Sequence, residues 1–206
     1  MTVPILILAG GASTRMGSRN KLLEPVRGQP LLRMQAWRAM KASRDVSVLY
    51  RPGQPAIRRA LAGLAVKHIV AREAFEGMGG SIRAGTLAHL RAKCFVMMLA
   101  DLVEIEASDL RDVMQARAQS ENNFHIFQAA TDDGQPGHPI LFDRTIYSEL
   151  MNLRGDVGAR DILKRHADHI KLVPLKGQRA RLDLDTPEAW DHWRAQQPRV
   201  NVDHVP

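Results

Sequence analysis

The sequence ILILAGGASTRMGSRNK, residues 5–21, decides the fold of this chain. Its apolar start, Ile5 to Leu8, is typical of a short strand that is buried on both faces in a parallel sheet. The strand ends at Ala9-Gly10-Gly11, where minimal side chains let backbone N–H groups approach a ligand. Arg15 and Lys21 add two cations beyond the glycines. Backbone donors and fixed cations after a first strand suit a polyphosphate.

Two well-known phosphate-binding loops differ from this one. No Gly-Lys-Ser/Thr follows the glycines, which excludes a Walker loop, and the Gly-x-Gly-x-x-Gly pattern of dinucleotide-binding folds is absent. The glycines alone are also compatible with an ordinary turn beside solvated cations. The preceding strand and the two cations together favour the phosphate interpretation.

Length and composition predict one globular domain. The chain has 206 residues, 45% of them hydrophobic and 25% charged, and we expect residues 1–195 to form one domain and residues 196–206 a mobile tail. The single cysteine, Cys94, cannot form an internal disulfide, which fits a reducing cytoplasm. The N-terminal apolar stretch is too short for a signal core, and no segment reaches the length of a membrane span.

The net charge of +7 raises the question of nucleic acid. The basic residues are spread along the chain and often adjoin acids, as in Arg111-Asp112 and Arg160-Asp161, and aromatic residues make up only 5% of the chain. Neither a basic run nor a stacking surface is indicated. We therefore expect small anionic ligands and no nucleic acid partner.

Apolar runs and helical patterns alternate along most of the chain. Strands are predicted at 5–8, 46–49, 67–70 and 94–100, and helices at 29–43, 56–64, 81–91 (capped by Ser81) and 108–120 (capped by Ser108). Strands at 124–130 and 138–142 flank a turn, which predicts an antiparallel addition. Helices at 145–153, after an Asp156 cap and at 186–193, and paired strands at 170–174 and 180–184, complete the prediction. The fold class is α/β, a three-layer, Rossmann-like, mostly parallel sheet with helices on both faces.

Three aspartates follow or alternate with apolar residues. Asp101 ends the most apolar run, at the carboxyl end of the predicted central strand, where ligands bind in such sheets. Asp183 and Asp185 alternate with leucines, so both carboxylates share one face. Alone, Asp101 is equally compatible with a loop cap, and the other two with an outward polar edge.

The run Leu8-Ala-Gly-Gly-x-Ser-x-Arg-Met-Gly, followed by Lys21, resembles the signature loop of the molybdenum cofactor nucleotidyltransferases, which attach a nucleotide to molybdopterin. The resemblance implies the nucleotide-diphospho-sugar transferase type of fold. It also implies nucleotide contacts in this loop from Leu8, Ala9, Gly10, Gly11, Ser13, Arg15 and Lys21.

Three later blocks also resemble the same family. Gly77-Met-Gly-Gly-Ser81 is similar to a stretch beside the nucleotide, which implicates Gly79, Gly80 and Ser81, although a tight turn and cap would explain it too. Gly-His-Pro-Ile-Leu-Phe at 137–142 and Arg-Gly-Asp-Val-Gly-Ala-Arg at 154–160 resemble the acceptor side of the cytidylyltransferase branch. They implicate His138, Asp156 and Arg160, which as single residues would pass for a loop histidine, a helix cap and a solvated charge.

The resemblance implies a metal-dependent transfer. Asp101 would hold Mg²⁺, or alternatively Mn²⁺, together with Asp185 or Asp183 of the closing Asp-x-Asp-Thr-Pro-Glu motif. Arg15 would bind the β- and γ-phosphates, and Lys21 would neutralise charge at the α-phosphate, so the implied catalytic residues are Arg15, Lys21 and Asp101. The implied partners are CTP or GTP and a phosphorylated acceptor of molybdopterin type, with delivery of the product to a molybdoenzyme or its chaperone.

Two departures from the family leave alternatives open. Leu102-Val103-Glu104 replaces a Pro-containing pair after Asp101, which keeps open a non-catalytic nucleotide- or pterin-binding carrier or regulator. Ala9-Gly10-Gly11 resembles the guanylyltransferase loop, where a missing side chain would leave room for a purine. The blocks at 137–142 and 154–160 match the cytidylyltransferases, so we expect CTP, with GTP as the alternative.

Overall fold

The computed structural model describes residues 2–11, 16–17, 19–120 and 123–197. The strands are β1 Ile5–Leu8, β2 Pro25–Val26, β3 Gln29–Pro30, β4 Val46–Tyr50, β5 Lys67–Val70, β6 Cys94–Leu99, β7 Ile126–Ala130, β8 Pro136–Asp143 and β9 Ile170–Pro174. The α-helices are α1 Leu31–Ala42, α2 Pro55–Ala60, α3 Met78–Ala88, α4 Ala107–Ala118, α5 Tyr147–Met151, α6 Arg160–Arg165 and α7 Pro187–Gln196. Short 3₁₀ helices are η2 Lys21–Leu23, η3 Arg72–Glu76, η4 Arg144–Ile146 and η5 Ala167–His169.

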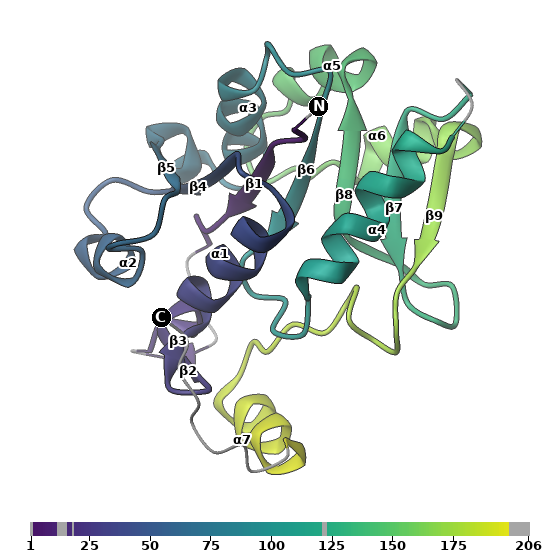
Figure 1. Ribbon diagram of the computed structural model, residues 1–206. Coiled ribbons are helices and arrows are strands. Elements are labelled where there is room, and N and C mark those ends of the chain that lie inside the picture. The colour runs from purple at the N-terminus through teal and green to yellow at the C-terminus, as the bar shows by residue number, and fades with distance from the viewer. Residues whose placement is uncertain (1, 12–15, 18, 121–122, 198–206) are drawn as a thin grey trace.

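The main sheet has seven strands in the order β5-β4-β1-β6-β8-β7-β9. β1 pairs in parallel with β4 and β6, and β4 pairs in parallel with β5. β8 is antiparallel to both β6 and β7, and β7 is parallel to β9. The expected fold class, with β6 at the centre and an antiparallel addition, is confirmed (Figure 1).

Side chains that alternate along the central strands pack into two separate cores. Ile5 and Ile7 of β1 pack with α1, α2 and α4, whereas Leu6 and Leu8 pack with α3, α5 and α6. Figure 1 shows α1 and α4 in front of the sheet. All four residues of β1 are buried, as a strand covered on both faces requires. The helices therefore form a layer on each side of the sheet.

A third, smaller core joins the β2–β3 hairpin to the end of the chain. Trp190 of α7 is completely buried there against Val26, Leu31 and Met34. α7 begins as expected at Pro187, with the Thr186 hydroxyl accepting from Ala189 N at 3.2 Å. This contact brings the Asp183–Asp185 segment beside the end of β6.

The predicted helix caps were wrong at three positions. Ser81 lies inside α3, which begins at Met78 after Gly77 (φ 117°). Ser108 lies inside α4, where Glu106 is the cap and its N–H donates to Asp109 at 2.8 Å. Asp156 does not cap α6; its carboxylate accepts from Met78 N at 3.1 Å and so caps α3. Local spacing cannot reveal a cap supplied from another part of the chain.

The predicted strand at 180–184 was also wrong. Residues 177–181 form a turn, and the stretch contacts the sheet through a hydrogen bond from His138 N to the Ala180 carbonyl at 2.8 Å and through an isolated bridge between Leu102 and Asp183. β9 pairs instead with β7, the neighbouring strand of the antiparallel addition. The expected tail falls almost entirely on residues 198–206, outside the described part of the chain. Within the described residues, no helix has the length and apolarity that crossing a membrane demands.

Candidate active site

The ammonium group of Lys21 joins two carboxylates from distant parts of the chain. Lys21 Nζ donates to Asp101 Oδ2 and, at 2.6 Å, to Asp185 Oδ1. The local fold aims this lysine: Asn20 caps η2 by accepting from Leu22 N at 3.0 Å, and Leu22 anchors η2 in the core. The first glycine loop, the end of β6 and the segment before α7 thus meet at one point.

The three predicted aspartates come together. Carboxylate oxygens of Asp101, Asp183 and Asp185 lie within 4.8 Å of one another. Between the last two, Leu184 is buried, and its carbonyl accepts from the indole N–H of Trp190 at 3.0 Å. This anchor turns Asp183 and Asp185 toward Asp101, so the two carboxylates share a face although no strand forms there.

The charges of this acidic cluster, Asp101, Asp183 and Asp185, are only partly balanced. Burial acts to lower the pKa of Lys21, but the nearby Asp101 and Asp185 more than offset it, and the pKa lies above its ordinary value. Partial burial, with repulsion from Asp185 and Asp101, raises the pKa of Asp183. Within the described part of the chain, three carboxylates gather around the Lys21 ammonium, an arrangement that favours a cation beside them.

The residues of the acidic cluster fit a divalent metal ion. Asp101 Oδ1 is buried and has no hydrogen-bond partner among the described residues, so one acceptor oxygen of the cluster is unsatisfied. All the potential metal-ligating atoms are carboxylate oxygens, the ligands that Mg²⁺ and Mn²⁺ take. The group is therefore a candidate site for such an ion.

A cleft of about 1130 Å³ adjoins the acidic cluster at Asp183. Its floor is made by side chains of the sheet, among them Met97 and Ile140, and one wall by residues 156–164. Of the residues predicted from the sequence, the cleft brings together Leu8, His138, Asp156, Arg160 and Asp183. Further cations on its wall are Lys164 and Arg181.

His138 contributes a neutral ring to this cleft. Burial lowers its pKa to about 4, despite the opposite effects of the Met97 carbonyl and of Asp101. Its Nδ1 atom is buried without a hydrogen-bond partner among the described residues. His138 is therefore uncharged near pH 7, and its Nδ1 atom can form one more hydrogen bond.

The second glycine run is explained by packing. A Cβ at Gly79 would lie 2.9 Å from the carbonyl oxygens of Arg154 and Val157, and one at Gly80 would lie 1.9 Å from that of Glu73. Gly79 N also donates to the Gly155 carbonyl at 2.9 Å. Gly79 thus docks the 154–157 segment onto α3, which is how Asp156 reaches the cap position, and Gly80 lets η3 pack against the same helix.

The first glycines differ from one another. A Cβ at Gly10 would lie 3.2 Å from Ser81 Oγ and 3.3 Å from Ala74 Cβ, whereas one at Gly11 would meet nothing within 4 Å. Gly10 and the buried Ser81 are thus packing partners, and Gly11 borders open space. The predicted contacts at Ser13 and Arg15 lie outside the described residues.

Two residues that the sequence did not single out as functional hold the segment after Asp101. Gln35 Nε2 donates to the Leu102 carbonyl at 2.6 Å, and Arg38 Nη1 donates to those of Val103 and Ile105 at 2.8 and 2.9 Å. Both side chains are buried in α1. The sequence did contain a signal for a buried role of Arg38, because this residue occupies a position in the apolar pattern of the helix.

Comparison with known proteins places this geometry in a family. Residues 5–170 match the family model described as MobA-like NTP transferase domain. The purine catabolism protein PucB of Bacillus subtilis (strain 168) is 27% identical over 205 residues, which cover 93% of this chain and 97% of PucB.

Solved structures show the same fold. The crystal structure of Rv0371c from Mycobacterium tuberculosis H37Rv is 27% identical, with a TM-score of 0.80, over 95% of this chain and 99% of that one. A manganese complex of Rv0371c is 24% identical, with a TM-score of 0.79, over 96% and 100% of the two chains. CMP:2-keto-3-deoxy-manno-octonic acid synthetase complexed with CTP has a TM-score of 0.73 at 14% identity, over 95% and 98%.

Proposed function

Since this chain belongs to the MobA-like NTP transferase family, we propose that it transfers the cytidylyl group of CTP to a phosphorylated acceptor of molybdopterin type, with release of pyrophosphate. The observation that carries this proposal is the acidic cluster bound by Lys21 at the carboxyl end of β6. Nucleotidyl transfer needs positioned phosphates and neutralised charge more than a protein nucleophile. The cluster and its lysine offer both.

The proposed metal ion is Mg²⁺, with Mn²⁺ as an alternative. Asp101 would hold it together with Asp183 or Asp185, since the three carboxylates lie within 4.8 Å. The existence of a manganese complex of Rv0371c supports a divalent ion in this fold. When bound, the ion would neutralise charge on the triphosphate and the departing pyrophosphate.

Lys21 has a second proposed role beyond holding the aspartates. Its raised pKa keeps the ammonium charged at neutral pH, so it remains a cation for an incoming phosphate. In exchange for one carboxylate contact it would stabilise charge at the α-phosphate. Arg15 is proposed to bind the β- and γ-phosphates bidentately.

The environment of Gly10 bears on the choice between CTP and GTP. The volume that an alanine would fill there is taken up by Ser81 and Ala74, so this glycine is explained by packing against α3 and η3. The argument from Gly10 for a purine base then loses its force. The blocks around His138 and Asp156, which resemble the cytidylyltransferase branch, remain as support for CTP.

The acceptor is assigned to the cleft beside Asp183. Its floor is apolar, and exposed Met78 and Val157 extend the apolar wall, which suits a flat heterocycle. Arg160, Lys164 and Arg181 offer cations to a phosphate on that heterocycle. His138 would hydrogen-bond the ligand through its buried, unpartnered Nδ1.

The test is a panel of substrates with the purified chain. With Mg²⁺ and molybdopterin, CTP should release pyrophosphate, and GTP and ATP should release far less. A preference for GTP would make the chain a guanylyltransferase of the same family. Nucleotide and pterin binding without pyrophosphate release from any nucleotide would make it a carrier or regulator.

A further inference from the structure

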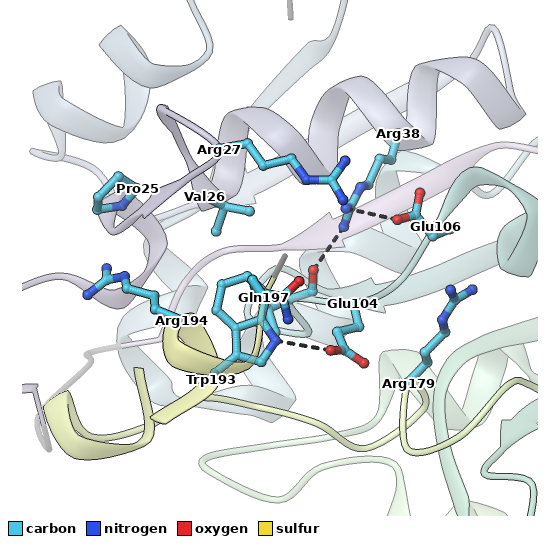
Figure 2. Close-up of a pocket in the computed structure, with 11 residues that line it drawn as sticks. Pro25, Val26, Arg27, Arg38, Glu104, Glu106, Arg179, Trp193, Arg194 and Gln197 are labelled. Atoms are coloured by element: carbon cyan, nitrogen blue, oxygen red, sulfur yellow. Dashed lines mark hydrogen bonds and ion pairs between the residues drawn. The ribbon is translucent and has the colours of Figure 1, made fainter. Parts of the chain in front are cut away.

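A second cavity, of about 420 Å³, lies between the β2–β3 hairpin, α1, the 103–106 segment and α7 (Figure 2). It shares no lining residue with the cleft beside Asp183. Four arginines and two glutamates line it: Arg27, Arg38, Arg179, Arg194, Glu104 and Glu106. We call it the arginine pocket.

Guanidinium groups converge in the arginine pocket. Burial lowers the pKa of Arg38, and the charges of Arg27 and Arg179 lower it further, against the opposing effect of Glu106. In the view of Figure 2 the side chains of Arg27 and Arg38 extend toward the same part of the pocket, and Arg38 Nη2 donates to Glu106 at 3.0 Å. Glu106 already pairs with Arg38, so Arg27 is the guanidinium that would attract a further anion.

Nearby carboxylates pair with three of the four arginines of the pocket: Glu106 with Arg38, Asp109 with Arg179, and Glu24 with Arg194 at 2.6 Å. Asp109 accepts from Arg179 at 3.2 Å and also from the backbone N–H of Glu106. Glu104 accepts from the indole N–H of Trp193 at 3.0 Å. Arg27 is exposed and makes no hydrogen bond or ion pair with the described residues. Its charge is available to a ligand.

Arg27 has a strained backbone conformation, and the hairpin turn itself does not require an arginine there. Arg27 and Gly28, with φ angles of 50° and 77°, form the two-residue turn between β2 and β3. Such turns favour Asn or Gly at the first position, and another residue in this left-handed region costs about 1–2 kcal/mol. The turn therefore does not account for an arginine here, whereas a ligand contact would.

The other residues that line the pocket are apolar except for Gln197. Val26 and Val103 are buried, and Trp193 presents a partly exposed indole. Guanidinium groups that approach from three elements suit the several oxygens of a tetrahedral anion better than the two oxygens of a planar carboxylate. The volume exceeds that of a phosphate ion, which leaves room for an organic group.

We propose that the arginine pocket is a second ligand site, which binds a small molecule carrying a phosphate and an apolar group, separate from the proposed nucleotide site. Arg27 and Arg38 contact the phosphate, and Val26 and Trp193 contact the apolar group. The ligand also lies against the 103–106 segment that follows Asp101.

The probe is phenyl phosphate, titrated into the full chain without nucleotide while tryptophan fluorescence is recorded. The expected result is a saturable change that disappears in Trp193→Phe. Arg27→Gly, which relieves the strained turn, should weaken binding about tenfold or more, since one charge-assisted pair is lost. Arg44→Ala, which removes an exposed arginine elsewhere, should bind as the parent does.

Further variants and a second ligand test where phenyl phosphate binds and whether its phosphate group is recognised. Lys21→Ala should retain the fluorescence change, since Lys21 belongs to the acidic cluster and not to this pocket. Arg27→Asn, which also accepts the left-handed backbone, should repeat the loss if Arg27→Gly folds poorly. The absence of a saturable change, unaltered binding in both Arg27 variants, or loss in Lys21→Ala would overturn the proposal. Benzoate binding as tightly as phenyl phosphate would overturn the assignment of a phosphate.

Discussion

Lys21 and Asp185 are 164 positions apart in the chain, yet Lys21 Nζ lies 2.6 Å from Asp185 Oδ1. The same ammonium binds Asp101, so a single lysine joins the first loop, the central strand and the segment before the last helix. Apolar packing of Leu184 and Trp190 in the third core holds the same segments together. The predictions below follow from that cluster and its surroundings.

Asp101→Asn should abolish nucleotidyl transfer and leave the fold intact. The amide keeps the volume of the side chain but removes the charge that a divalent ion needs, and Asp101 Oδ1 is a buried oxygen without a hydrogen-bond partner among the described residues. Pyrophosphate release and Mn²⁺ affinity measure the loss, and circular dichroism checks the fold. Asp112→Asn, at an exposed position of α4, is the matched control. Normal turnover in Asp101→Asn would make the metal assignment wrong.

Lys21→Ala should lower turnover about a hundredfold or more, as when one preorganised charge is removed from a developing anion. It should also destabilise the metal-free protein, because Asp101 and Asp185 then lose the ammonium group that they share. Added Mg²⁺ should restore much of the lost Tm. Lys176→Ala, at an exposed position, controls for net charge. A variant with lost CTP binding and unchanged turnover would place Lys21 on the ground-state phosphates.

Asp183→Asn should stabilise the metal-free protein at pH 7. Burial and repulsion raise the pKa of Asp183 in the folded state above its ordinary value of 3.8, so ionising this carboxyl costs stability as the pH rises through its folded pKa. The asparagine variant avoids that cost, and its Tm should exceed that of the parent at pH 7. The difference should shrink as the pH falls toward 4. Added Mn²⁺ should raise the Tm of the parent more than that of the variant; equal gains would argue against Asp183 as a metal ligand.

His138 should make the protein sensitive to acid. Its pKa falls from the ordinary 6.5 to about 4 on folding, so the neutral ring stabilises the fold fully above pH 6.5, and that contribution is lost as the pH falls toward 4. The shift corresponds to about 3 kcal/mol across that window. Urea unfolding of His138→Asn between pH 7 and pH 4 should show a shallower loss than the parent. The exposed His192→Asn is the control, and identical slopes in all three proteins would contradict the burial of His138.

Gly10→Ala should change stability without changing the preferred nucleotide. The added methyl group would lie 3.2 Å from Ser81 Oγ and 3.3 Å from Ala74 Cβ, so we expect a loss of about 1 kcal/mol. Adding Ser81→Ala should relieve part of it. A switch in the ratio of CTP to GTP turnover in Gly10→Ala would show that this glycine faces the base.

The sequence predicted the sheet and the acidic cluster because both depend on local patterns. Runs such as Ile5–Leu8 and Cys94–Leu99 are buried on both faces, and alternation put Asp183 and Asp185 on one side. What failed depended on partners distant in the chain. Asp156 caps α3 and not its own helix, and the 180–184 segment bonds to His138 of β8 and bridges to Leu102 without forming a strand.

The segment after Asp101 illustrates the same limit. The sequence showed only that Leu102-Val103-Glu104 lacks the family's proline. Buried Gln35 and Arg38 hold the carbonyls of Leu102, Val103 and Ile105, so side chains of α1 fix the backbone by hydrogen bonds. No pattern within residues 101–106 could have identified donors that lie more than sixty positions earlier.

The fate of isotopic label from CTP tests the central claim most directly. The purified chain is incubated with Mg²⁺, molybdopterin and CTP that is labelled at either the α- or the γ-phosphate. Transfer of the cytidylyl group predicts that the α-label appears in the pterin product and the γ-label in pyrophosphate. Release of γ-label as free phosphate, or its transfer to the pterin with no α-label in the product, would contradict nucleotidyl transfer at the Lys21–Asp101–Asp185 site.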